Sequence, residues 1–211
     1  MEVIPVLNCL DKHEADEKIK VLHAILPSGG WIHLDVADGR FTYHKSWADP
    51  HAWEKLAWSV KLEVHLMVEE PEHAVPVWIK AGAKRIIVHL ETVPNMEHII
   101  EECKNAGVEL MLATNPETPV VRLEPYFKTI SEFQVLAVHP GLAGQKFLPL
   151  TMEKVKLLRK EMPHARIEVD GGITAETARV AKAAGADAVA CGTFIFTSDD
   201  PKLAFSMLQH I

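Results

Sequence analysis

Short apolar runs alternate with longer amphipathic segments from one end of this 211-residue chain to the other. Eight apolar runs have the length and residue types of buried strands. They span residues 3–8, 31–36, 62–67, 85–90, 109–114, 133–138, 166–170 and 188–191. The segments between and after them have helical periodicity and span residues 14–26, 52–58, 72–81, 96–106, 120–127, 151–161, 175–184 and 201–209. This order of elements limits the fold more than any other feature.

Eight strand-helix units in one chain predict an α/β fold of the (β/α)8 TIM-barrel type, as a single domain over residues 1–211. The alternative is an open, doubly wound sheet, which usually carries a glycine-rich turn after its first strand. Here that turn reads Asn8-Cys9-Leu10-Asp11 and contains no glycine. The barrel is therefore favoured, and its active site is expected at the C-terminal ends of the strands.

Composition indicates which kinds of binding partner and which cellular compartment to expect. The net charge is -7 without a block of Lys or Arg, which argues against nucleic-acid or anionic-membrane binding. The three cysteines have no zinc-type spacing, and the odd count is no disulfide framework, so we expect a reducing, cytoplasmic location. Neither a signal peptide nor a membrane-spanning run is visible. The acidic balance does not exclude a small phosphate ligand, which needs only a few local donors.

Several predicted strands carry His or acidic residues at alternate positions near their ends, where a barrel interior is normally apolar. These residues are His33, Asp35, Glu63, His65, His89, Glu91, Glu168 and Asp170. Residues two apart in a strand point the same way, so all are expected to face the same mouth. Burying them unpaired is costly, and they therefore need partners or a metal.

His33, Asp35, His65 and Asp170 would supply two nitrogens and two carboxylates, a set that suits Zn²⁺, Fe²⁺, Mn²⁺ or Co²⁺ better than Ca²⁺ or Mg²⁺. The alternative for each histidine is a hydrogen-bonded core residue. Glu63 and Glu168 lie one layer deeper. They could orient the ligands or simply pair with Lys61 and Arg166.

Glycines follow three of the predicted strands and indicate a phosphate site. Gly141 and Gly144 follow the sixth strand, Gly171-Gly172 the seventh, and Gly192-Thr193 the eighth. Loops after strands seven and eight are the usual phosphate site of a barrel. Ordinary turns are the alternative for each glycine taken singly.

A set of motifs is similar to those of the ribulose-phosphate 3-epimerase family, almost from end to end. The motifs are His33-Leu34-Asp35-Val36, Asp38-Gly39, Val64-His65-Leu66-Met67-Val68, Asn115-Pro116-Glu117-Thr118-Pro119, Pro140-Gly141-Leu142-Ala143-Gly144-Gln145-Lys146-Phe147 and Ile167-Glu168-Val169-Asp170-Gly171-Gly172-Ile173.

The resemblance implies an isomerase of carbohydrate metabolism with one divalent metal (Zn, Fe, Mn or Co), held by His33, Asp35, His65 and Asp170. Asp35 and Asp170 would also be the acid/base pair, on opposite sides of C3 of a ketose 5-phosphate. The metal would stabilise the enediolate between the two proton transfers. The phosphate would rest on the backbone of Gly141, Leu142, Ala143, Gly144, Gly171, Gly172, Gly192 and Thr193.

The chain departs from the family pattern near the expected sugar end. Val6 stands where the family usually has serine, and Asn8 or Cys9 could replace that hydroxyl. Met67 matches a family methionine, but Ala37 and Leu136 stand at two other such positions. The loop 40–47 also differs, and His139 replaces a residue that is commonly Asn, Asp or Glu. Val6, Asn8, Met67 and His139 are expected to line the pocket.

The function predicted from these patterns is 3-epimerisation of D-ribulose 5-phosphate and D-xylulose 5-phosphate. The altered loops leave a second hypothesis, the same chemistry on another ketose phosphate such as D-allulose 6-phosphate. A non-catalytic phosphosugar-binding barrel is a third hypothesis. A related decarboxylase or aldolase-type synthase is disfavoured, because such relatives typically have other motifs at the strand ends. We also expect a homo-oligomer, because Trp47, Trp53 and Trp58 could form an interface, although they could equally pack an outer helix.

Overall fold

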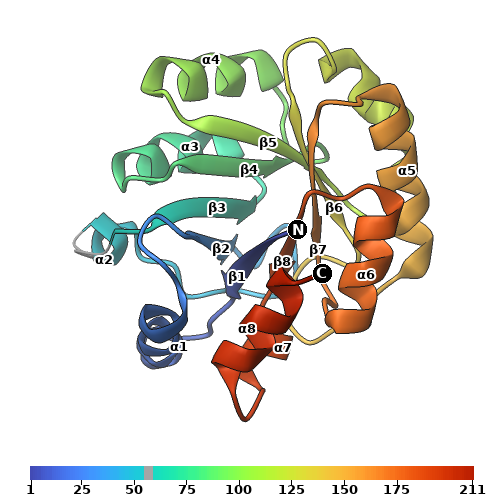
Figure 1. The fold of residues 1–211 in the computed structure, drawn as a ribbon. Helices are drawn as coiled ribbons and strands as arrows, with labels where there is room; N and C mark the ends of the chain where they lie inside the picture. The colour runs from blue at the N-terminus through green and yellow to red at the C-terminus, as the bar shows by residue number, and fades with distance from the viewer. Residues whose placement is uncertain (55–58) are drawn as a thin grey trace.

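Eight parallel strands close into a barrel in the computed structural model, which describes residues 1–54 and 59–211 (Figure 1). Each strand pairs with the next, and β8 pairs with β1. The strands are β1 (Glu2–Leu7), β2 (Trp31–Ala37), β3 (Lys61–Met67), β4 (Arg85–His89), β5 (Glu109–Thr114), β6 (Glu132–Leu136), β7 (Arg166–Asp170) and β8 (Ala188–Cys191). The barrel prediction is confirmed, and the open sheet is excluded.

Helices surround the strands on the outside (Figure 1). They are α1 (Lys12–Ile25), α2 (Pro50–Glu54), α3 (Pro71–Lys80), α4 (Met96–Ala106), η1 (Val120–Tyr126), η2 (Pro149–Thr151), α5 (Met152–Glu161), α6 (Ala175–Ala184), α7 (Thr193–Phe196) and α8 (Pro201–Gln209). Turn chemistry in the sequence accounts for several ends. Asp11 caps α1 through its side chain, and Gly107 and Gly185 end α4 and α6 in the left-handed conformation.

The predicted helices differ from the structure at residues 120–127, before α5 and after β8. Residues 120–127 form a 3-10 helix, because Pro125 has no N–H to donate and its ring would clash with the preceding turn of an α-helix. The short helix α7, directly after β8, was not predicted. The predicted helix 52–58 corresponds to α2, and its end lies outside the described residues.

The interior of the barrel is unusually polar. The buried side chains include His33, Glu63, His65, His89, Gln134 and Glu168, each with no exposed surface. The apolar core lies mainly between the strands and the helices, as in other barrels. The polar interior therefore marks positions where packing alone does not explain the sequence.

Arg85 at the start of β4 gathers three carboxylates at the N-terminal end of the barrel. Its guanidinium lies 2.6 Å from Glu63, 2.6 Å from Glu109 and 2.8 Å from Glu132. Its side chain is almost fully buried, so these charge-assisted contacts offset the cost of removing the cation from water.

The tryptophans of the second unit pack inward where the structure describes them. Trp53 is buried in the core, and Trp47 packs against it. Trp58 lies outside the described residues. Trp47 and Trp53 therefore give no support for a subunit interface, and the homo-oligomer stays a prediction. Among the described residues, no helix combines the length and apolar character that a membrane span requires.

Candidate active site and metal centre

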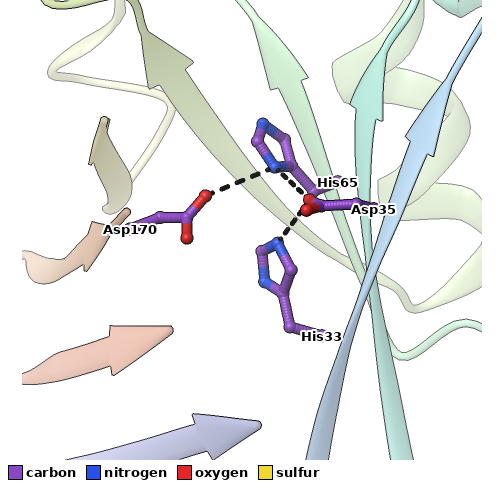
Figure 2. Close-up of side chains that lie close together, drawn as sticks. All are labelled: His33, Asp35, His65 and Asp170. Carbon is purple, nitrogen blue, oxygen red and sulfur yellow. Dashed lines mark hydrogen bonds and ion pairs between the residues drawn. The ribbon is translucent and has the colours of Figure 1, made fainter. Parts of the chain in front are cut away.

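Four side chains converge at the C-terminal mouth of the barrel: His33, Asp35, His65 and Asp170 (Figure 2). Strand alternation turns His33 and Asp35 inward from β2, and the β2–β3 register places Asp35 beside His65. Asp170 reaches in from β7, across the barrel from β3. The structure thus brings together the four residues that the sequence suggested as ligands.

The spacing of these four groups fits one divalent cation. One ligand atom from each lies within 4.8 Å of all the others. Nδ1 of His65 is 3.0 Å from Asp35 Oδ1 and 3.7 Å from Asp170 Oδ2, and Nε2 of His33 is 3.2 Å from Asp35 Oδ1. Bonds of about 2.0–2.2 Å to one ion would place ligand atoms roughly 3.0–3.6 Å apart. The cluster could therefore bind a metal such as Zn²⁺, Fe²⁺, Mn²⁺ or Co²⁺.

The ring nitrogen of His33 that faces away from this cluster is held by Glu63. His33 Nδ1 lies 2.7 Å from Glu63 Oε1, and the other oxygen of Glu63 accepts from Arg85 at 2.6 Å. A carboxylate behind a ligating histidine fixes its tautomer and ring orientation. Of the two sequence interpretations of Glu63, the structure supports the orienting one.

The pairings considered for Lys61 and Arg166 do not form. Lys61 lies over the ring of Trp31, and Arg166 pairs with Glu2 at 2.5 Å. Glu168 instead accepts from Gln134 Nε2 at 3.0 Å, with His33 Nδ1 at 3.7 Å. Burial raises the pKa of Glu168 to about 8, and the charge of Glu63 acts in the same direction.

His65 is backed by a chain of groups that runs away from the mouth. Its Nε2 lies 2.8 Å from His89 Nε2, and His89 Nδ1 lies 3.3 Å from Glu91 Oε2. If Nδ1 of His65 donates its lone pair to a metal, Nε2 carries the proton and donates to His89. His89 then donates its own Nδ1 proton to Glu91. The direction of every hydrogen bond in this chain is thereby fixed.

Glu91 ends this chain, and its stabilising effect should depend on pH. Burial alone would raise its pKa, but hydrogen bonds from His89, Thr118 and the Asn115 amide lower the pKa to about 2. The folded protein therefore gains stability from ionised Glu91 above about pH 4.5, and the gain is lost as pH falls toward 2.

We expect Glu91→Gln to lower the free energy of unfolding at pH 7 by about 1–2 kcal/mol, with the difference shrinking below pH 4.5. Urea denaturation of the metal-free protein at several pH values measures this. Glu101→Gln, on the exposed face of α4, serves as the control. A difference that is constant with pH would contradict the charge-based account.

The two carboxylates at the mouth differ in their electrostatic surroundings. Although burial opposes it, hydrogen bonds from His33 and His65 hold the pKa of Asp35 well below its usual range. Burial raises the pKa of Asp170 to about 7, with the charges of Asp35 and Glu63 adding to the rise. Without a cation, burial and these two neighbouring carboxylates thus disfavour the ionised form of Asp170.

A cavity of about 900 Å³ opens above the cluster, and both Asp35 and Asp170 line it. All residues proposed for phosphate binding line the same cavity: Gly141, Leu142, Ala143, Gly144, Gly171, Gly172, Gly192 and Thr193. So do the four expected pocket residues Val6, Asn8, Met67 and His139. His33 and His65 lie beneath it and are fully buried.

Gly172 brings the loop after β7 against the backbone at Phe147, which also lines the cavity. It has φ +65°, and an added Cβ would lie 2.5 Å from Phe147 N. Gly107 has nearly the same φ, +66°, but nothing lies within 4 Å of its added Cβ. We expect Gly172→Ala to cost about 2–4 kcal/mol of stability and Gly107→Ala about 1 kcal/mol, measured by urea denaturation. Equal losses would show that the contact with Phe147 yields easily.

Comparison with known proteins identifies relatives of this chain. The family model described as "Ribulose-phosphate 3 epimerase family" matches residues 2–196. The chain belongs to this family. Its membership confirms the expected family and the isomerase class of enzyme.

Individual relatives carry the name of the same family. A ribulose-phosphate 3-epimerase of Candida glabrata is 35% identical over 209 residues, covering 89% of this chain and 84% of the relative. One of Bacillus subtilis is 35% identical over 185 residues, covering 84% of this chain and 85% of the relative. The solved 3-hexulose-6-phosphate synthase from Salmonella typhimurium has a TM-score of 0.75 at 18% identity, covering 100% and 97% of the two chains. At that identity, the last likeness concerns the fold alone.

Sequence reasoning missed several groups around the epimerase-family cavity. Lys18 of α1 lines it, donates to the Asn8 carbonyl at 2.9 Å and pairs with Glu14 at 2.8 Å. Lys146 also lines it, although the phosphate site predicted for its motif includes only residues 141–144. His44 is buried beside Asn8 and was noted only as part of a divergent loop. The helical spacing of Glu14 and Lys18 was the one signal available for Lys18.

Proposed function

We propose that this protein is a metal-dependent 3-epimerase that interconverts D-ribulose 5-phosphate and D-xylulose 5-phosphate. Family membership supports the substrate class, and the curated relatives carry that enzyme's name. The observation that carries the mechanism is the placement of Asp35 and Asp170. They approach the same cavity from opposite sides of the barrel mouth (Figure 2).

Epimerisation at C3 requires that a proton leave one face of the carbon and that another arrive on the opposite face. A carboxylate on each side of the substrate meets this requirement, with one acting as base and the other as acid. Their roles exchange in the reverse reaction. Asp35 from β2 and Asp170 from β7 are the residues in this chain that we assign to the two faces.

The substrate is oriented by its phosphate in this proposal. Backbone N–H groups of the glycine-containing loops after β6, β7 and β8 are suited to an anion, because no Cβ blocks close approach. Lys18 and Lys146 add positive charge along the cavity wall. With the phosphate held there, C3 is placed between the two carboxylates by the length of the sugar chain.

His33, Asp35, His65 and Asp170 would hold the divalent cation. When bound, it supplies positive charge that stabilises the enediolate formed after the first proton leaves. The protein contributes the rigid orientation of the ligands. Glu63 holds His33, and His89 with Glu91 holds His65.

A second substrate is favoured by one feature of the cavity. Val6 presents an apolar side chain at the end of β1, where the resemblance implies a serine. This change lies at the sugar end and leaves the phosphate loops intact. D-allulose 6-phosphate, which has the same C3 chemistry and a longer chain, is therefore the second candidate.

The test is solvent deuterium incorporation at C3. Metal-loaded protein in D₂O is incubated separately with D-ribulose 5-phosphate and D-allulose 6-phosphate, and NMR follows the C3 signal and the epimer. We expect exchange and epimer formation with ribulose 5-phosphate to be faster. Faster turnover of allulose 6-phosphate would select the second candidate, and no C3 exchange with either would refute an epimerase.

A further inference from the structure

Asn8, just after β1, contacts three elements of the mouth and has no part in the proton transfers assigned to Asp35 and Asp170. Its Nδ2 donates to Asp35 Oδ2 at 2.9 Å and to the Gly141 carbonyl at 3.0 Å. Its Oδ1 lies 2.8 Å from Nε2 of His44. One amide thus joins three elements of the mouth: the β2 carboxylate, the loop after β2 and the loop after β6.

The chemistry of the amide fixes its orientation. A carboxylate and a carbonyl are both acceptors, so only the NH₂ group can face Asp35 and Gly141. The amide oxygen then faces His44, which must carry its proton on Nε2. His44 is itself held by its own loop. Its backbone N–H donates to Thr42 Oγ1, and the Thr42 hydroxyl donates to the backbone carbonyl of His44.

The two oxygens of Asp35 are consequently used differently. Oδ1 faces His33 and His65 at 3.2 and 3.0 Å, on the side of the ligand cluster. Oδ2 faces Asn8 on the side of the cavity. A carboxylate held at both oxygens cannot rotate about its side-chain bond without breaking one of these contacts.

We propose that Asn8, oriented by His44, is a positioning residue that keeps Asp35 aimed for proton transfer and couples it to the loop at Gly141. This inference rests on the proposed epimerase function. Because the same NH₂ group binds Asp35 and the Gly141 carbonyl, a shift of that loop moves the amide and changes the restraint on Asp35. Binding of phosphate beside Gly141 would thereby be communicated to the carboxylate.

The direct test is Asn8→Ala, measured by the initial rate of loss of C3 protium in D₂O starting from each epimer in turn. If Asp35 serves one face, its misplacement slows exchange from one epimer by about 10–100-fold. Exchange from the other epimer, which begins at Asp170, should stay within about threefold of wild type by the same reasoning. Metal content should equal that of wild type.

Variants of His44 keep the inference testable if Asn8→Ala folds poorly. His44→Phe removes the donor to Asn8 and should give the same one-sided loss at smaller size. His44→Gln, which retains an N–H donor, should lie closer to wild type. The double variant Asn8→Ala/His44→Phe should lose no more than Asn8→Ala, because the two act through one contact chain. Tyr43→Ala, at the exposed neighbour of His44, is the loop control.

The outcomes separate this inference from the proposed function. Wild-type exchange at C3 with normal exchange from both epimers in Asn8→Ala and His44→Phe would overturn the positioning role and leave the epimerase standing. Equal losses from both epimers would also overturn it, because they indicate a general effect on the site. Absence of exchange in the wild type would refute the function itself.

Discussion

Replacing Asp170 by Asn is expected to lower kcat for epimerisation by about 10²–10⁴-fold. Asn has nearly the same size as Asp, but it can neither accept nor deliver the C3 proton. Asp170 is the acid/base group that we assign to the β7 side of the cavity, and no other carboxylate among the described residues of the ligand cluster approaches from that side. The rate of epimer formation, followed by NMR, measures the loss.

Two controls separate proton transfer from other effects of this change. Asp199→Asn alters an exposed aspartate and should leave the rate unchanged. Metal analysis of Asp170→Asn shows how much of the loss comes from a missing ligand. Exchange of solvent deuterium from the epimer that Asp35 deprotonates should persist. Full epimerase activity in Asp170→Asn would contradict the two-carboxylate mechanism.

Removing the His65 imidazole should weaken metal binding strongly, because it removes one of the four assigned ligands. His65 lies at 0% exposure between Asp35 and Asp170, so His65→Ala leaves a gap in the centre of the ligand set. Changes to groups behind a ligand already cost about 10–100-fold in metal affinity, and loss of the ligand itself should exceed about 100-fold. Competition with a chromophoric chelator measures this for Zn²⁺ and Co²⁺ without an activity assay.

His98→Ala is the matched control, because His98 lies on the exposed face of α4, outside the cluster. Its metal affinity should equal that of wild type. Removal of metal from the wild-type protein by a chelator should abolish C3 exchange, and added Zn²⁺, Mn²⁺, Co²⁺ or Fe²⁺ should restore it. Undiminished metal affinity in His65→Ala would rule out the assigned ligand set.

Much of the fold and of the ligand cluster could be predicted because both follow from local periodicity. Strand alternation places His33 and Asp35 on one face, and parallel strands bring their C-terminal ends to one mouth. Once eight units are counted, the position of Asp170 at the end of its strand follows. The observed strands begin and end close to the predicted positions for the same reason.

Contacts between elements were harder to predict. Glu63 and Lys61 lie two residues apart, which suggested a pair, but the β3–β4 register places Arg85 opposite Glu63. Lys61 begins its strand at the surface instead. Likewise, the Asn8–His44 contact depends on the path of a loop between β2 and α2, and no periodicity describes that path. Register and loop geometry are properties of the assembled fold.

Arg85 links the N-terminal end of the barrel to the ligand cluster, which matters for redesign of this fold. From the end of the barrel opposite the cavity, it binds the carboxylate that orients His33. The buried polar residues below the ligand cluster therefore cannot be replaced to raise thermal stability without affecting the cluster itself. A chimeric barrel that contains the four ligands would also need Glu63 and Arg85. Without them, His33 would lose the carboxylate that orients its ring.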